Sequence, residues 1–157
     1  MTEPWIHLGM RVRAELSARD SAGDVLRSIC RAVEHRAESG GLEWRVLAAF
    51  NEAFNNIVAH AYAPGQVGEA CIDVTVDAAR LVLELRDDGC GFDYDARSKQ
   101  ALPAVDTLDA GGMGLFIVRK AMSSVTYERG APNRLRMVRD LRAESCVRDL
   151  KDDEASR

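Results

Sequence analysis

The sequence lacks the residue patterns that mark metal centres, disulfide frameworks and membrane spans. None of its four cysteines forms a CxxC pair and its three histidines are scattered, so no zinc site is expected. A chain of 157 residues can bury a core without disulfide bonds, which favours reduced thiols. No apolar run approaches the roughly 20 residues that span a bilayer, and no basic and then apolar leader opens the chain. These absences predict a cytoplasmic protein.

An excess of charge of one sign is also missing. The 21 Lys and Arg residues stand against 25 Asp and Glu residues, which gives a net charge of −4. A mildly acidic protein has no general attraction to nucleic acid or to anionic lipid, so we expect neither as a direct partner. With 46% hydrophobic and 29% charged residues, the composition is typical of one folded globular domain.

The spacing of apolar residues predicts helices and strands in a definite order. Apolar residues recur at helical intervals over Ser21–Glu38 and Glu43–Tyr62, and a third helix is expected to start near Gly114. Asp20 or Ser21 is a suitable N-cap for the first helix. Period-two alternation predicts strands at residues 5–13, 70–76, 81–86, 125–128 and 134–138. This order predicts an α+β fold, a two-layer sandwich with a mixed sheet and its helices on one face.

Glycine-rich motifs lie at both ends of a long irregular segment, residues 88–112. Irregular stretches of this length inside a compact domain are usually functional. At the first end, Asp87 closes a predicted strand and is followed by Gly89 and Gly91. A carboxylate at that point can accept a hydrogen bond from an amino group, and the glycines allow close approach of a flat ligand. The third residue after Gly91 is Tyr94, which excludes the GxGxxG dinucleotide motif.

At the second end, the sequence GGMG at residues 111–114 leads directly into the third predicted helix. Glycines before a helix leave backbone N–H groups free at the positive end of the helix dipole, an arrangement that suits phosphate. The chain has no GxxxxGK[ST] sequence, which excludes a P-loop enzyme.

The second predicted helix carries Glu52 and Asn56 one turn apart, on the side opposite its apolar face. Their neighbours on that side are the small residues Ala48, Ala49 and Ala59, which leave room for a ligand to approach. Taken alone, each of the three motifs is also compatible with a plain alternative: a solvated helix face, an acidic turn or a flexible loop.

In this order and at these intervals, the three motifs resemble the Bergerat-type ATP fold of the GHKL superfamily, which includes gyrase, Hsp90, histidine kinases and MutL. Within it, the likeness is strongest to the anti-sigma-factor serine kinases, whose N-box resembles EAFNNIVAHAY at residues 52–62. The likeness covers residues 5–141, one domain, and includes NRLRMV at 133–138. Residues 142–157 form a charged tail that the resemblance does not explain.

The resemblance implies that the chain binds ATP and Mg²⁺. Asn56 would offer its side-chain oxygen to Mg²⁺, and Glu52 would orient the attacking hydroxyl group and accept its proton. Asp87 would accept a hydrogen bond from the adenine amino group, and Gly89 and Gly91 would give the base room. Backbone N–H groups of the lid would contact the phosphates, at Gly112, Met113, Gly114 and Leu115.

The same resemblance implies a protein serine/threonine kinase that acts by partner switching. It would phosphorylate a serine of a STAS-type anti-anti-sigma protein, and in its other state it would hold a sigma factor or a similar client inactive. Phosphate on that serine would disfavour binding by its charge and bulk. Proteins of this kind are commonly homodimers, and the first strand, at residues 5–13, is a candidate edge for the dimer contact.

One departure from the family pattern concerns Ala110, which stands where some members carry an arginine that reaches the terminal phosphate. Arg97, Lys99 or Arg119 could supply that charge instead. An alternative function is therefore a nucleotide-dependent protein-binding regulator without significant kinase activity. The catalytic half of a histidine kinase is a third alternative, disfavoured because only one strand and one helix precede the N-box helix.

Four further residues could be mistaken for functional groups. His60 is expected to have a structural role near the end of its helix, and Cys90 to be an inert thiol. Trp5 and Trp44 are expected to pack or to contact partners, not to stack on a nucleotide.

Overall fold

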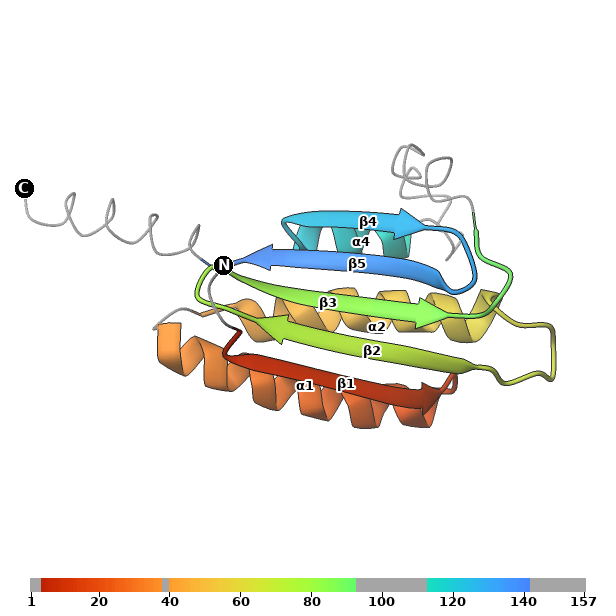
Figure 1. Ribbon diagram of the computed structural model, residues 1–157, viewed down its shortest axis with the longest axis horizontal. Coiled ribbons are helices and arrows are strands. Elements are labelled where there is room, and N and C mark those ends of the chain that lie inside the picture. The colour runs from red at the N-terminus through yellow and green to blue at the C-terminus, as the bar shows by residue number, and fades with distance from the viewer. Residues whose placement is uncertain (1–3, 38–39, 93–112, 142–157) are drawn as a thin grey trace, which may run out of the picture.

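The computed structural model of the protein describes residues 4–37, 40–92 and 113–141. These residues form a five-stranded sheet in the order β1-β2-β3-β5-β4, with the described helices packed on one of its faces (Figure 1). The strands are β1 (Ile6–Arg13), β2 (Glu69–Val76), β3 (Arg80–Asp87), β4 (Ser124–Glu128) and β5 (Asn133–Asp140), and the helices are α1 (Leu16–Ala37), α2 (Leu42–His60) and α4 (Met113–Ala121). The expected α+β two-layer sandwich is confirmed.

The sheet differs from the expectation in one respect, because all four pairings among the described strands are antiparallel where a mixed sheet was predicted. The reason lies in the connection between β1 and β2. Helix α1 carries the chain back along β1, and α2 returns it to the end at which β1 finished, where Arg13 pairs with Glu69. Two antiparallel helices in succession therefore make the next strand antiparallel to the first.

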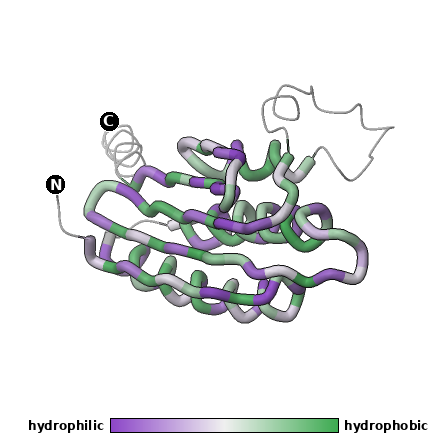
Figure 2. Tube along the Cα trace, turned by 45° about the vertical axis from the view of Figure 1, so that its right-hand side comes forward, coloured by the Kyte–Doolittle hydropathy of each residue, from purple (hydrophilic) through white to green (hydrophobic). Residues whose placement is uncertain are grey.

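One face of the sheet builds the core with the helices. Side chains of β2 and β3 alternate between buried and partly exposed positions, as the period-two pattern predicts. The same alternation of hydrophobic and hydrophilic residues is visible along the strands in Figure 2. Phe50 and Phe54 of α2 are fully buried with their ring centroids 5.5 Å apart, and they anchor this helix in the core. Fully buried partners in the sheet include Ile72, Val74, Leu81, Leu83 and Leu85.

Helix α1 begins at Leu16, before the expected N-cap at Asp20 or Ser21. The hydroxyl group of Ser21 donates to the carbonyl oxygen of Ser17, one turn earlier, and the Asp20 carboxylate accepts from Arg19. Both side chains are therefore engaged inside the helix, because a serine hydroxyl can bond to a preceding carbonyl as well as cap a helix.

Helix α2 receives its N-terminal cap from α1. Gly41 precedes the helix with a φ of 88°, and no side chain from its own turn caps the helix. Glu34 of α1 does so instead, because its Oε1 atom accepts hydrogen bonds from the N–H groups of Leu42 (2.6 Å) and Glu43 (3.1 Å). A carboxylate at this end also complements the helix dipole. The position of α2 is thus tied to that of α1.

No helix in the described part of the chain is long and apolar enough to cross a membrane.

Replacing Glu34 with alanine is expected to lower the free energy of unfolding by about 1 kcal/mol, the usual cost of a lost N-cap. The N–H groups of Leu42 and Glu43 lose their acceptor in this variant. Urea unfolding followed by circular dichroism measures the difference. Glu128→Ala is the matched control, because its side chain is 72% exposed, and it should change stability by less than about 0.5 kcal/mol. Equal losses in the two variants would contradict the capping role of Glu34.

Candidate functional site

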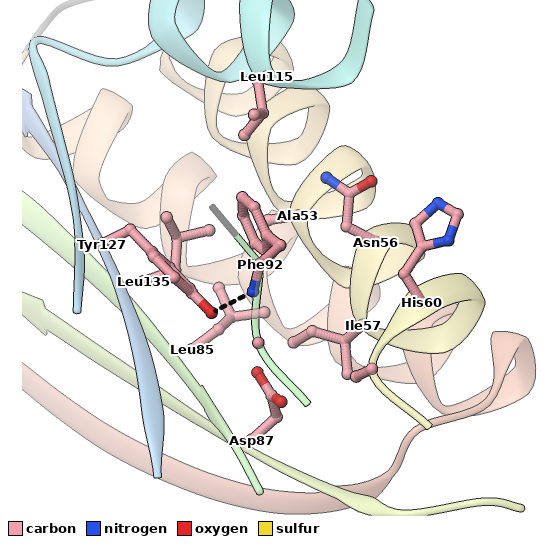
Figure 3. A pocket seen from close by; sticks show the side chains of 12 residues that line it. Ala53, Asn56, Ile57, His60, Leu85, Asp87, Phe92, Leu115, Tyr127 and Leu135 are labelled. Atoms are coloured by element: carbon pink, nitrogen blue, oxygen red, sulfur yellow. Dashed lines mark hydrogen bonds between the residues drawn. The ribbon is translucent and has the colours of Figure 1, made fainter. Parts of the chain in front are cut away.

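The three motifs meet at one end of the molecule, around a pocket that opens to solvent (Figure 3). The C-terminal half of α2 forms one wall, β3 and β5 form the floor, and α4 lies above. The lining residues are mostly apolar, with a few polar groups among them, which is the usual composition of a small-molecule site. They are Ala53, Asn56, Ile57, His60, Ala61, Leu85, Asp87, Gly91, Phe92, Leu115, Tyr127 and Leu135.

Asp87 is the last residue of β3, and its carboxylate faces the pocket (Figure 3). One of its oxygens, Oδ1, accepts hydrogen bonds from the backbone N–H of Gly89 at 2.9 Å and from Nδ2 of Asn133 at 3.1 Å. Neither bond uses Oδ2. Within the described part of the chain, the carboxylate is therefore held by Oδ1, which leaves Oδ2 as an acceptor for a ligand in the pocket.

The glycines after Asp87 allow close packing of the loop against other parts of the protein. A Cβ atom on Gly89 would lie 2.4 Å from the carbonyl oxygen of Ala61, at the end of α2. The N–H group of Cys90 donates to that same oxygen at 2.9 Å. Gly91 lines the pocket with a φ of 66°, a conformation that favours glycine. The loop is thus fixed to the end of α2, a contact that the sequence did not predict.

Gly114 brings the start of α4 against the polar side of α2. A Cβ atom on Gly114 would lie 2.8 Å from Oε2 of Glu52 and 3.8 Å from Nδ2 of Asn56. The structure therefore brings these three predicted site residues together, with Asn56 in the pocket lining and Glu52 half-buried beside it. Ala49, expected on an open face, is fully buried, which shows that α2 is packed on this side as well.

Two aromatic residues that the sequence did not single out stand in the pocket. The rings of Phe92 and Tyr127 stack with centroids 4.4 Å apart, and the N–H of Phe92 donates to the Tyr127 hydroxyl oxygen at 3.2 Å (Figure 3). Burial raises the pKa of Tyr127, and the negative charge of Asp87 adds to this rise. Its hydroxyl group therefore stays protonated at neutral pH. Two features of the sequence could have indicated these residues. Tyr127 lies in a predicted strand, and Phe92 directly follows Gly91.

The residues expected to form a lid lie only partly within the described residues. Met113 is the first, exposed residue of α4, and Leu115 lines the pocket. Gly112 and Ala110 lie outside the described residues, as do Arg97 and Lys99. Arg119 lies in the last turn of α4.

His60 and Cys90 lie side by side at the end of α2. His60 is the last residue of that helix, as expected, and it also lines the pocket. The Cys90 thiol donates to the carbonyl oxygen of His60 at 3.3 Å.

Burial raises the pKa of the remote Cys30 thiol to about 12, which makes that cysteine unreactive.

The donor set fits a nucleotide with its magnesium ion better than an isolated metal ion. In the described ranges, no group of three or more His, Cys, Asp or Glu side chains could hold a metal. Mg²⁺ bound to a triphosphate needs only one or two protein oxygens, because phosphate and water supply the others. The side-chain oxygen of Asn56, in the pocket lining, could provide one of them.

Gly89→Ala is expected to destabilise the protein by about 1–3 kcal/mol, because the new methyl group would overlap backbone and cannot rotate away. Thermal unfolding measures the change. Gly40→Ala is the matched control, since no atom lies within 4 Å of the position that its Cβ would take. Two variants with the same melting temperature as the parent protein would contradict the close contact between Gly89 and Ala61.

Comparisons with known proteins agree with this geometry. Residues 12–139 match the family model described as a histidine kinase-like ATPase domain. The chain is 31% identical over 106 residues to the serine-protein kinase RsbW of Bacillus subtilis, covering 64% of this chain and 66% of that protein. It is 33% identical over 94 residues to the serine/threonine-protein kinase BtrW of Bordetella bronchiseptica, covering 58% of this chain and 65% of that protein. The matched part thus spans just under two thirds of the length of these relatives.

A solved structure supports the fold. The SiaB–SiaC complex of Pseudomonas aeruginosa contains a chain that aligns with a TM-score of 0.58 and 16% identity, covering 87% of this chain and 90% of that one. At this identity the likeness concerns the fold alone. Together with the family match, it leads to one conclusion: the chain belongs to the histidine kinase-like ATPase domain family, and its sequence is similar to those of the serine-protein kinases RsbW and BtrW.

Proposed function

We propose that the protein binds Mg²⁺-ATP and transfers the γ-phosphate to a serine of a partner protein. The observation that carries the proposal is the meeting of a base-recognising carboxylate, Asp87, with Glu52 and Asn56 beneath the start of α4. The similarity to two protein kinases supports the same chemistry.

The pocket supplies what an adenine base requires. The Oδ2 atom of Asp87 can accept a hydrogen bond from the 6-amino group, because the hydrogen bonds that the described residues make to this carboxylate use Oδ1. Ile57, Leu85 and Leu135 offer apolar surface to the base. A carboxylate discriminates by charge, because it attracts an amino group and repels a carbonyl oxygen at the same position.

The phosphate end lies toward Glu52, Asn56 and the first residues of α4. Asn56 would hold Mg²⁺, which neutralises charge on the phosphates when it is bound. The N–H groups of Met113 and Gly114 begin a helix of 9 residues, where the dipole favours negative charge. Phosphoryl transfer needs positioning and charge stabilisation more than covalent help, so these groups meet its main requirements.

Glu52 would act as the general base. Its carboxylate accepts a hydrogen bond from the serine hydroxyl and takes the proton as the serine oxygen bonds to phosphorus. The bond between that phosphorus and the oxygen of ADP breaks in the same step. Gly114 leaves room for the Glu52 carboxylate, because a Cβ atom at this position would lie 2.8 Å from its Oε2 atom.

The partner in this proposal is a STAS-type protein, and the protein kept inactive is a sigma factor or a similar client. Phosphate on the partner's serine adds negative charge and bulk, so the phosphorylated partner would leave and the client would bind. The chain would act as a homodimer in the cytoplasm, where ATP is available. Strand β1 is one edge of the described sheet, which supports its use as a dimer contact.

A nucleotide-dependent binding protein without kinase activity is the second candidate function. Ala110 favours it, because this position does not supply the cation that some related kinases place near the terminal phosphate.

Glu52→Gln should abolish phosphoserine formation when the protein is mixed with labelled ATP, Mg²⁺ and a STAS-domain protein from the same organism. Loss of a general base typically lowers the rate by about 10²–10⁴-fold, whereas the affinity for ATP should stay close to that of the parent. Glu69→Gln is the control, because its side chain is 66% exposed in β2. Unchanged transfer by Glu52→Gln would reject the base assignment, and ATP binding without transfer in the parent would favour the second candidate function.

Asn56→Ala should remove the part of ATP affinity that depends on Mg²⁺ and leave the fold intact, because Asn56 is only half-buried. Calorimetric titration of ATP with Mg²⁺ and with EDTA measures this part in each protein. We expect a loss of about tenfold or more, the effect of one lost charge-assisted contact. Asn51→Ala, at an exposed position of the same helix, should behave like the parent. An undiminished effect of Mg²⁺ on Asn56→Ala would reject the metal assignment.

A further inference from the structure

We propose that Asn133, the first residue of β5, is a positioning residue for base recognition. It holds the Asp87 carboxylate so that its free oxygen accepts the 6-amino group, and the site then selects a 6-aminopurine over a 6-oxopurine nucleotide. This inference rests on the proposed nucleotide function and adds to it a residue that touches no nucleotide itself.

Burial is the first observation behind this role. Asn133 is 1% exposed, and among the described residues it is the polar residue that is buried in the interior. Burying an amide group is costly unless its hydrogen-bonding capacity is used. A residue at this position that served only to fill space would be apolar, as Leu135 and Met137 are further along the strand.

The hydrogen bonds of Asn133 explain its burial. Its Nδ2 group donates to Oδ1 of Asp87 at 3.1 Å and to the carbonyl oxygen of Gly89 at 2.9 Å. Its own Oδ1 accepts from the N–H of Gly130 at 3.2 Å. The side chain therefore links the loop after β3 to the turn between β4 and β5.

These partners fix the orientation of the amide group. If the amide were flipped, its oxygen would face the oxygens of Asp87 and Gly89, and its NH₂ group would face the N–H of Gly130. All three hydrogen bonds would be replaced by repulsive contacts. Only one orientation is consistent with the surroundings, so the donor always points to Asp87.

The backbone places Asn133 for this contact. In the antiparallel pairing of β3 and β5, Asn133 is directly opposite Asp87. Neighbouring side chains in such a pair are within reach of each other on the same side of the sheet. A Cβ atom on Gly91 would lie 2.7 Å from Oδ1 of Asn133, so this residue also limits what can follow in the loop.

The consequence is a carboxylate with two different oxygens. Both donors, from Gly89 and from Asn133, meet at Oδ1, which fixes the plane of the group from two directions. Without Asn133, the backbone N–H of Gly89 is the remaining donor at that oxygen, and the carboxylate can rotate about it. A rotating carboxylate presents its acceptor less often in the direction of the base, which weakens selectivity more than it weakens binding of the phosphates.

The test compares ATP with inosine triphosphate, which carries a carbonyl oxygen in place of the 6-amino group. Dissociation constants for both are measured by calorimetry in the presence of Mg²⁺ for the parent protein, Asn133→Leu, Asn133→Asp and Asn133→Ser. The selectivity ratio is the dissociation constant of inosine triphosphate divided by that of ATP. This ratio should fall by about tenfold in the variants, the effect of one hydrogen bond to a charged group. The affinity for inosine triphosphate should remain within about threefold of that of the parent protein.

Two variants serve as controls. Asp87→Asn should lose the preference for ATP, because its amide can donate to a carbonyl oxygen as well as accept. Asn55→Leu removes an amide at a different place, on α2, where Oδ1 of Asn55 accepts a hydrogen bond from Arg19 of α1 at 2.8 Å. This variant should keep the ratio of the parent protein. Thermal unfolding shows which variants are folded, and Asn133→Asp and Asn133→Ser provide the measurement if Asn133→Leu is not.

The possible outcomes separate the two levels of the argument. An unchanged ratio in the folded variants, whether both affinities fall equally or neither changes, would overturn the positioning role and leave Asn133 as a structural residue. A parent protein that binds neither nucleotide would instead overturn the proposed nucleotide function. A fall in the ratio without a matching loss of affinity for inosine triphosphate supports the inference.

Discussion

The candidate site depends on one backbone contact, between the loop that follows β3 and the end of α2. The N–H of Cys90 donates to the carbonyl oxygen of Ala61, and Gly89 has no side chain to prevent the approach. This contact sets the position of Asp87 relative to the helix that carries Glu52 and Asn56. Because α2 is also anchored in the core by Phe50 and Phe54, the loop after Asp87 and the side chains of Glu52 and Asn56 are supported by the same helix.

Much of the fold could be predicted from the sequence, because its signals are local. Period-two alternation located the strands, and the apolar spacing located α2 almost to its ends. The sequence also led to the correct family, since Glu52, Asn56, Asp87 and Gly114 are separate along the chain but occur in a characteristic order. The structure brings these four residues to one end of the molecule.

Features that depend on tertiary contacts could not be predicted in this way. Ser21 is suited to cap a helix, but its hydroxyl group bonds to the preceding turn and α1 starts earlier. The cap of α2 comes from Glu34, a residue of another helix that no local pattern connects with Leu42. The contact between Asn133 and Asp87 can be recognised only when the register of β3 and β5 is known. The parallel or antiparallel direction of the strands likewise depends on how the helices return the chain.

The pairing of β3 with β5 has a consequence for the way the protein acquires its site. The hairpins β2–β3 and β4–β5 join neighbours in the chain, whereas Asp87 and Asn133 are 46 residues apart and meet only after a large loop has closed. Closing such a loop is entropically costly and slow compared with forming a hairpin. A ligand that binds only the folded chain at this junction stabilises it by mass action, so under the proposed function the free energy of unfolding would rise with the nucleotide concentration.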